Sequence, residues 1–201
     1  MKRFVFGSLT VLTIAILALA MSATSARANT LTPNLVSVTG GANSTFNYNV
    51  MLSPSGELDT LHSTVTEFVT INDIAGYVSC SAPAGWSCSS ALIGSTGYLT
   101  SPPDNGSIPN VTFTWTGTGD ITGPVTYTGF SIVSKDPNTT LGYWSDTDVK
   151  NDPGQTDDET TQGSVGSVNV PAPAPVPEPS SLVMLGSGLI GLIGLRRKLA
   201  A

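Results

Sequence analysis

Hydrophobic and polar residues alternate along several short stretches of this chain. In residues 45–52 the apolar side chains occupy every second position, and residues 110–116 repeat this pattern. A period of two is typical of β-strands that bury one face. Glycine, proline, asparagine and aspartate separate these stretches, and we find no convincing amphipathic helix between residues 29 and 170. The pattern therefore predicts a succession of short strands.

Weaker patterns complete this prediction. A bulge is expected at Gly129, where the apolar phase of its strand shifts. A short helix is predicted over residues 58–67, a small hairpin over residues 91–99 and a short edge strand over residues 141–144. Strands without intervening helices predict an all-β domain over residues 29–170, an antiparallel β-sandwich of immunoglobulin-like or jelly-roll-like topology. The remaining strands are predicted at residues 35–39, 65–71, 77–80, 125–134 and 165–170.

The N-terminal segment follows a different pattern. Basic residues and a long apolar run fill residues 1–21, and Ala26 and Ala28 form a small-residue A-x-A cleavage site. This arrangement predicts a secretory signal peptide over residues 1–28, which implies export by the Sec translocon and cleavage by signal peptidase. An uncleaved N-terminal membrane helix is the alternative. The mature chain is expected to begin at Asn29.

The C-terminal end contains three parts in a fixed order. A proline-rich linker covers residues 171–179, an uncharged apolar segment covers residues 180–195, and a basic cluster follows. As a helix, the apolar segment would rise about 24 Å, somewhat less than the ~30 Å hydrocarbon core of a bilayer. Because cations beyond such a helix stay on the cytoplasmic side, residues 180–201 are predicted to hold the chain in the inner membrane.

This terminal arrangement closely resembles the PEP-CTERM sorting signal of Gram-negative bacteria. The resemblance implies that exosortase, a membrane transpeptidase-like cysteine enzyme, reads the signal. It also implies a route to the cell envelope or the extracellular matrix, with only a transient membrane anchor. An ordinary C-terminal membrane anchor is the alternative. The residues that carry the resemblance are Pro177, Glu178, Pro179, Arg196, Arg197 and Lys198.

The charge of the exported part is strongly negative. Residues 29–195 contain two of the eight Lys and Arg residues but all fourteen Asp and Glu residues, which gives a net charge of −12. Such a surface repels the phosphates of nucleic acids, so nucleic acid is excluded as a partner. The charge otherwise favours solubility.

Cys80 and Cys88 are the two cysteines, and both lie in the exported part. An even pair in an oxidising compartment predicts one disulfide. A metal site is the alternative, but two sulfurs without a nearby histidine provide too few ligands. Residues 77–88 also resemble a hairpin of bacterial surface immunoglobulin-like modules.

Residues 145–161 are polar and acidic without a periodic pattern, which predicts a solvated loop. Their oxygens are of the type that calcium prefers, although the spacing does not match an EF-hand loop. An aromatic pair precedes this loop and is the candidate for stacking on a sugar. The candidate ligand residues are Tyr143, Trp144, Asp146, Asp148 and Asp152.

Catalytic signatures are weak in this chain. His62 is the single histidine, and no nucleophile motif accompanies it. We therefore expect a non-enzymatic protein of the cell envelope or extracellular matrix, without a resident cofactor or metal. The resemblance alone implies a biofilm or exopolysaccharide context. A carbohydrate- or calcium-binding module is the alternative function, and a hydrolase is disfavoured.

Overall fold

The computed structural model describes residues 29–59, 65–97, 100–151, 161–174 and 187. These residues form an all-β fold with antiparallel sheets. The strands are β1 Leu31–Thr39, β2 Ser44–Leu52, β3 Gly56–Leu58, β4 Phe68–Ile71, β5 Tyr77–Ser81, β6 Trp86–Ala91, β7 Asn110–Trp115, β8 Ile121–Thr122, β9 Val125–Ser134, β10 Asn138–Lys150, β11 Thr161–Gln162 and β12 Val165–Ala172.

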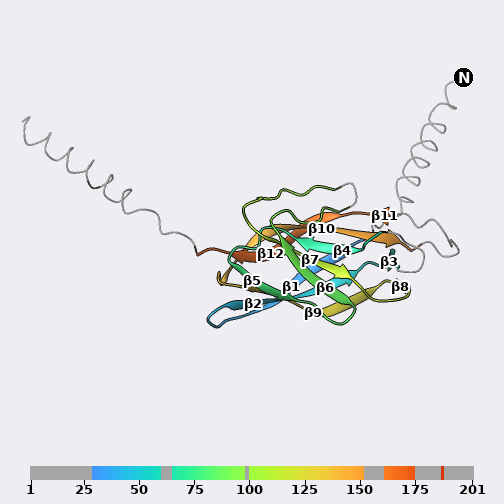
Figure 1. Cartoon of the computed structure of the whole chain (residues 1–201), viewed down its shortest axis with the longest axis horizontal. Helices are drawn as coiled ribbons and strands as arrows, with labels where there is room; N and C mark the ends of the chain where they lie inside the picture. Colours follow the sequence, from blue (N-terminus) through green and yellow to red (C-terminus); the bar gives the residue numbers. More distant parts are fainter. Residues whose placement is uncertain (1–28, 60–64, 98–99, 152–160, 175–186, 188–201) are drawn as a thin grey trace, which may run out of the picture.

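The strands make two sheets that lie as two layers (Figure 1). The smaller sheet has the order β1-β2-β9-β5. The larger sheet has the order β6-β7-β4-β10-β3-β8, with β11 and β12 also paired to β10. Aromatic side chains of the two sheets meet between the layers, and the ring centroids of Phe113 and Phe130 lie 4.9 Å apart. The fold is therefore sandwich-like.

Alternation of side chains explains how the core forms. In β2 every second side chain is fully buried, as predicted for residues 45–52, because successive side chains of a strand point to opposite faces. The hydroxyl of Tyr48 donates a hydrogen bond of 3.0 Å to the carbonyl of Asn169, which links β2 to β12 in the other sheet. The buried residues of this face of β2 are Phe46, Tyr48, Val50 and Leu52.

Strand β10 is the central element of the larger sheet, and here the sequence prediction was wrong in extent. Residues 141–144 were expected to form a short edge strand followed by a solvated loop. Instead β10 continues to Lys150, because β12 and β11 pair along one of its edges and β4 and β3 along the other. Residues 145–150 of the predicted acidic loop are therefore part of an interior strand.

The disulfide between Cys80 and Cys88 is confirmed, with the two Cα atoms 6.2 Å apart. Its setting differs from the predicted hairpin. Strand β5 is an edge of the smaller sheet and pairs with β9, whereas β6 is an edge of the larger sheet and pairs with β7. The chain therefore crosses from one sheet to the other between the cysteines, and the disulfide joins two sheet edges.

Of three further local predictions, the bulge is confirmed, whereas the helix and the hairpin are wrong in their described parts. The register of β2 with β9 shifts at Gly129, which has a φ of 94°, so the predicted bulge is present. The helix expected over residues 58–67 is absent from its described ends, since Leu58 closes β3 and residues 65–67 are not helical. The hairpin expected over residues 91–99 is wrong in its described part, where residues 92–97 form no strand.

Both ends of the chain lie outside the described residues. This applies to the predicted signal peptide with Ala26 and Ala28, and to the predicted C-terminal helix apart from residue 187. Strand β12 ends at Ala172, two residues beyond the predicted domain boundary, so the proline-rich linker begins later than expected. No helix in the described ranges is long and apolar enough to cross a membrane.

Candidate functional site

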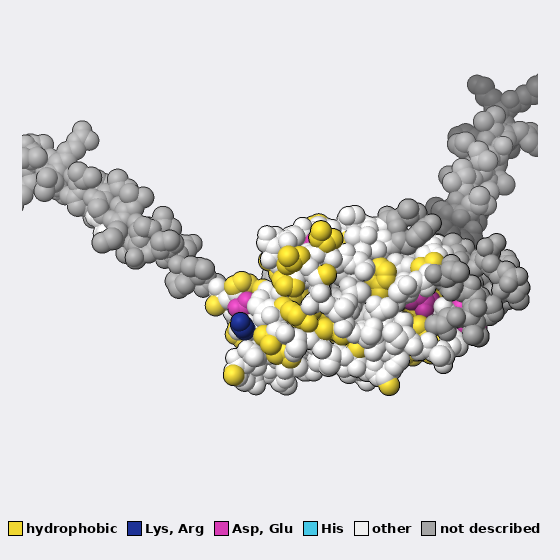
Figure 2. All heavy atoms as spheres, viewed as in Figure 1, with side chains coloured by type: hydrophobic (Ala, Val, Ile, Leu, Met, Phe, Trp, Pro, Cys, Tyr) yellow, Lys and Arg dark blue, Asp and Glu magenta, His cyan; other side chains and the backbone are white. Residues whose placement is uncertain are grey.

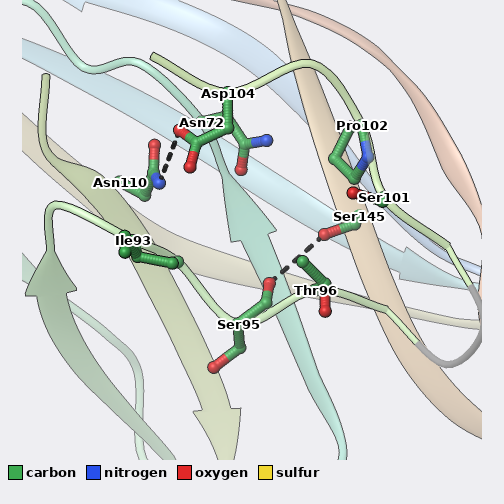
Figure 3. Close-up of a pocket in the computed structure, with 10 residues that line it drawn as sticks. Asn72, Ile93, Ser95, Thr96, Ser101, Pro102, Asp104, Asn110 and Ser145 are labelled. Carbon is green, nitrogen blue, oxygen red and sulfur yellow. Dashed lines mark hydrogen bonds between the residues drawn. The ribbon is translucent and has the colours of Figure 1, made fainter. Parts of the chain in front are cut away.

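A pocket with a volume of about 180 Å³, lined by polar side chains together with Ile93 and Pro102, lies on the larger sheet, between that sheet and the chain that connects β6 to β7 (Figure 3). Three of its residues come from strands or strand ends, since Asn72 follows β4, Asn110 begins β7 and Ser145 lies within β10. The others come from the connecting chain and face them across the cavity. The lining residues are Asn72, Ile93, Gly94, Ser95, Thr96, Ser101, Pro102, Asp104, Asn110 and Ser145.

The buried amide of Asn110 holds this connection in place. Its Nδ2 donates a hydrogen bond of 2.9 Å to Oδ1 of Asp104, and its Oδ1 accepts one of 2.7 Å from the backbone N–H of Asp73. On the other side of the pocket, Oγ of Ser145 donates to the carbonyl of Ser95 at 3.4 Å. The sheet thereby fixes polar groups of the loop before any ligand binds.

Gly94 allows the connection to lie this close to the sheet. A Cβ at this position would lie 2.8 Å from Cγ2 of Thr70 and 2.9 Å from Cβ of Asn110. Both distances are shorter than ordinary contacts, so a larger residue would push the loop away from the sheet. The dimensions of the pocket therefore depend on a glycine at this position.

The lining residues supply hydrogen-bond donors and acceptors rather than an acid–base pair. Asp104 is the single carboxyl among them, and the amides and hydroxyls around it are neutral. This chemistry suits a ligand with many hydroxyl groups. Sequence reasoning missed the pocket, because its residues come from distant segments. The one available signal was the cluster of asparagine and aspartate residues at strand ends.

Tyr143 and Trp144 do not form the exposed aromatic pair that the sequence predicted. Tyr143 is 44% exposed, whereas Trp144 is only 5% exposed. They are neighbours on β10, so their side chains point to opposite faces of the sheet. Tyr143 instead shares its face with Ser145, about 7 Å further along the strand, and so stands beside the pocket.

Asp146 and Asp148 lie in the interior and not in a solvated loop. Both have 0% exposure and point to the core face of β10, on the same side as Trp144. Asp146 accepts hydrogen bonds from the backbone N–H groups of Leu31 and, at 2.6 Å, of Ser164. Neither carboxylate oxygen of Asp148 has a hydrogen-bond partner among the residues that the structure describes.

Burial changes the acidity of both side chains. It raises the pKa of Asp146 to about 7, although the hydrogen bonds from Leu31 and Ser164 act in the opposite direction. Burial also raises the pKa of Asp148 to about 9, and the negative charges of Asp146 and Glu67 add to this effect. The carboxyl groups are therefore poorly compensated when ionised.

The predicted calcium ligands do not form a metal site in the described ranges. No three Asp, Glu, His or Cys side chains there are grouped so that they could hold a metal ion. Asp152 and His62 lie outside the described residues. Of the predicted ligand residues, the structure thus places Asp146 and Asp148 together in the core and leaves Tyr143 on the surface.

Comparison with known proteins identifies one segment of the chain. Neither a curated protein nor a solved structure matches this chain. Residues 175–198 match the family model of the PEP-CTERM protein-sorting motif. This match confirms the resemblance that the terminal residues indicated, including Pro177, Glu178 and Pro179. The chain therefore carries a PEP-CTERM protein-sorting motif, which makes it an exported protein targeted to an exosortase and directed to the cell envelope or the extracellular space.

Proposed function

We propose that this protein is a non-enzymatic component of the cell envelope or extracellular matrix, and that its sandwich-like domain binds a neutral glycan. In this proposal the Sec translocon exports the chain and signal peptidase removes residues 1–28. Residues 180–201 hold the chain in the inner membrane until exosortase acts on it. The sorting motif supports the location, and the pocket supports the binding activity.

The observation that carries the glycan proposal is that the pocket, which combines amide and hydroxyl groups with apolar surface, lies beside exposed Tyr143. Glycans present hydroxyl groups, which pair with fixed amides and hydroxyls such as those of Asn72, Asn110 and Ser145. An aromatic ring beside such groups offers an apolar face for the C–H groups of a sugar ring. Both parts lie on the outer side of the larger sheet.

The charge of the surface favours a neutral polymer over an anionic one. The exported part is acidic, so it repels anionic polysaccharides. Most of the face shown in Figure 2 is either hydrophobic or uncharged, with basic side chains visible at one end only and acidic side chains visible near both ends. A neutral glycan could approach this face without electrostatic cost.

The pocket also favours binding over catalysis. Most glycoside hydrolases use a pair of carboxyl groups on opposite sides of the scissile bond. Asp104 is the single carboxyl of the pocket, and it already accepts a hydrogen bond from Asn110. The lining residues therefore support recognition of a sugar rather than its hydrolysis.

Affinity electrophoresis tests this proposal. The exported protein is run through gels that contain dextran, a β-glucan, a galactomannan or the neutral exopolysaccharide of the producing strain. We expect retardation by at least one polymer. Tyr143→Ala should weaken it about fivefold, because stacking contributes ~1 kcal/mol. Ser101→Trp should abolish it, since this exposed residue lines the pocket and the indole would fill it.

Val36→Ala is the matched control. Val36 is exposed on β1 in the other sheet, so its truncation should leave the retardation unchanged. Lack of retardation by every polymer would contradict glycan binding. Release of reducing sugars from a retarding polymer would contradict the non-enzymatic part of the proposal.

A further inference from the structure

The carboxyl group of Asp148 is buried in the core without a partner, within the described part of the chain, that would compensate a negative charge. Its side chain is fully buried, and neither of its oxygens has a hydrogen-bond partner among the described residues. This burial, with a further contribution from the charges of Asp146 and Glu67, raises its pKa. A buried carboxylate is costly unless a cation or hydrogen-bond donors compensate it. The cluster therefore requires a positive charge or a proton.

The start of the described chain lies beside this cluster. Asn29 is only 2% exposed, and its carbonyl accepts a hydrogen bond of 3.0 Å from Oγ of Ser164. The backbone N–H of the same serine donates to Asp146, as does the N–H of Leu31. The backbone nitrogen of Leu31, which contacts Asp146, thus lies only two residues after the backbone nitrogen of Asn29.

The chain also runs from this contact toward Asp148. The N–H of Thr30 donates to Oγ of Ser53 at 3.1 Å. A Cβ built on Gly56 would lie 3.3 Å from that Oγ and 2.7 Å from Oδ2 of Asp148, so the two oxygens are at most 6.0 Å apart. Thr30, which lies between Asn29 and Leu31, is therefore tied through Ser53 to the surroundings of Asp148.

The nitrogen of Asn29 is the group that signal peptidase is predicted to set free. Hydrolysis of the peptide bond after Ala28 consumes one water, leaves a carboxylate on Ala28 and leaves an α-ammonium group on Asn29. We propose that Asp146 and Asp148 bind this α-ammonium group, so that removal of the signal peptide completes the buried charge cluster. This inference rests on the predicted cleavage site and goes beyond the proposed glycan binding.

Other cations fit the cluster less well. Lys150 lies two residues after Asp148 on the same face of β10, but its side chain is exposed and no hydrogen bond reaches either oxygen of Asp148. A metal ion needs several converging ligands, and the described residues contain no group of three suitable side chains. An ammonium group needs only acceptors, and carboxylate oxygens are the strongest available.

The pKa of the α-amine gives a direct test. The mature chain, residues 29–201, is prepared in mild detergent with an authentic N-terminus, and the α-amine is labelled by ¹³C reductive methylation and titrated by NMR. We expect its pKa to lie about one unit or more above the ordinary value of ~7.7. In Asp148→Asn it should return toward the ordinary value. An ordinary pKa in the mature chain would overturn the proposal.

A one-residue extension provides an independent test that does not require the label. A chain that retains Ala28 moves the ammonium group away from the carboxylates. We expect the folding equilibrium constant of the extended chain at pH 7.5 to be about tenfold lower than that of the mature chain. Asp148→Asn should abolish this difference, whereas Asp104→Asn, a control in the pocket, should retain it. Equal stability of the extended and mature chains, or the same difference in Asp148→Asn, would overturn the proposal.

Discussion

Two groups of buried polar side chains on the larger sheet, those of the pocket and those of the core face of β10, differ in how their hydrogen-bonding groups are satisfied. In the pocket, the buried groups Asn72, Asn110 and Ser145 are neutral and each makes a hydrogen bond. On the core face of β10, Asp146 is hydrogen-bonded, but within the described ranges Asp148 has no hydrogen-bond partner. The first arrangement is complete without a ligand. The second becomes stable only with a proton or a cation, and this difference predicts how each responds to mutation and pH.

The largest effect is expected for Asp146→Ala. This change leaves the N–H groups of Leu31 and Ser164 buried without an acceptor, which should lower the free energy of unfolding by about 4 kcal/mol. Urea unfolding measures it. Asp104→Ala is the comparison from the pocket, and it should cost about 1 kcal/mol because Asp104 is exposed. Similar losses for both variants would contradict the distinction between the two places.

The next effect is a pH dependence of the chain that retains residues before Asn29. Burial raises the pKa values of Asp146 and Asp148 to about 7 and about 9, above the value of 3.8 expected when unfolded. At pH values between the unfolded and the folded pKa of each group, the folded state binds more protons than the unfolded state. The contribution of both groups to stability is therefore greatest near pH 4 and is lost as the pH rises. Unfolding midpoints from pH 4 to pH 9 measure this loss.

The double variant Asp146→Asn, Asp148→Asn is the control for the pH series. It removes both titrating groups, so the midpoint should vary little over the same range. A steep fall that persists in this variant would show that other groups cause it, among them Glu57, Asp59 and Glu67, which are also buried acids.

A smaller effect is expected for Asn110→Ala in the pocket. The change removes the acceptor of the Asp73 N–H and the donor to Asp104, and should lower the free energy of unfolding by about 2 kcal/mol without changing its pH dependence. Stability measured at pH 5 and pH 8 checks both points. A loss that grows with pH would couple the pocket to the carboxyl groups of β10.

The smallest effect on stability is expected for Tyr143→Ala. Its side chain is largely on the surface, so the free energy of unfolding should change by less than about 0.5 kcal/mol. Glycan retardation should nevertheless weaken, as described above. A large loss of stability would instead assign Tyr143 to the packing of β10.

Local patterns were sufficient where one face of a strand meets the core. The alternation over residues 45–52 predicted β2, and the phase shift at Gly129 predicted the bulge in β9. The cysteine pair predicted the disulfide, but the sequence did not reveal that β5 and β6 belong to different sheets. Pairing of distant strands decides that, and no local pattern reports it.

The site residues depended more strongly on distant contacts. Aspartate is rare in strands, so the second half of β10 was expected to be a loop. It is a strand because β3, β4, β11 and β12 pair along its edges. Leu31, 115 residues away from Asp146 in the sequence, supplies one of the hydrogen bonds that the buried carboxylate of Asp146 needs. The pocket likewise assembles from β4, β7, β10 and the chain between β6 and β7. For the same reason Trp144 was assigned to the surface, although the core receives it.

The ladder between β10 and β12 also determines how the domain would respond to mechanical force. Eight residue pairs join these strands, from Ser145 with Val165 to Asn138 with Ala172. The sorting segment leaves at the Ala172 end, whereas Asn29 contacts Ser164 at the other. Tension between the two chain ends would therefore act along β12 and at right angles to its hydrogen bonds, which would have to break together rather than one after another.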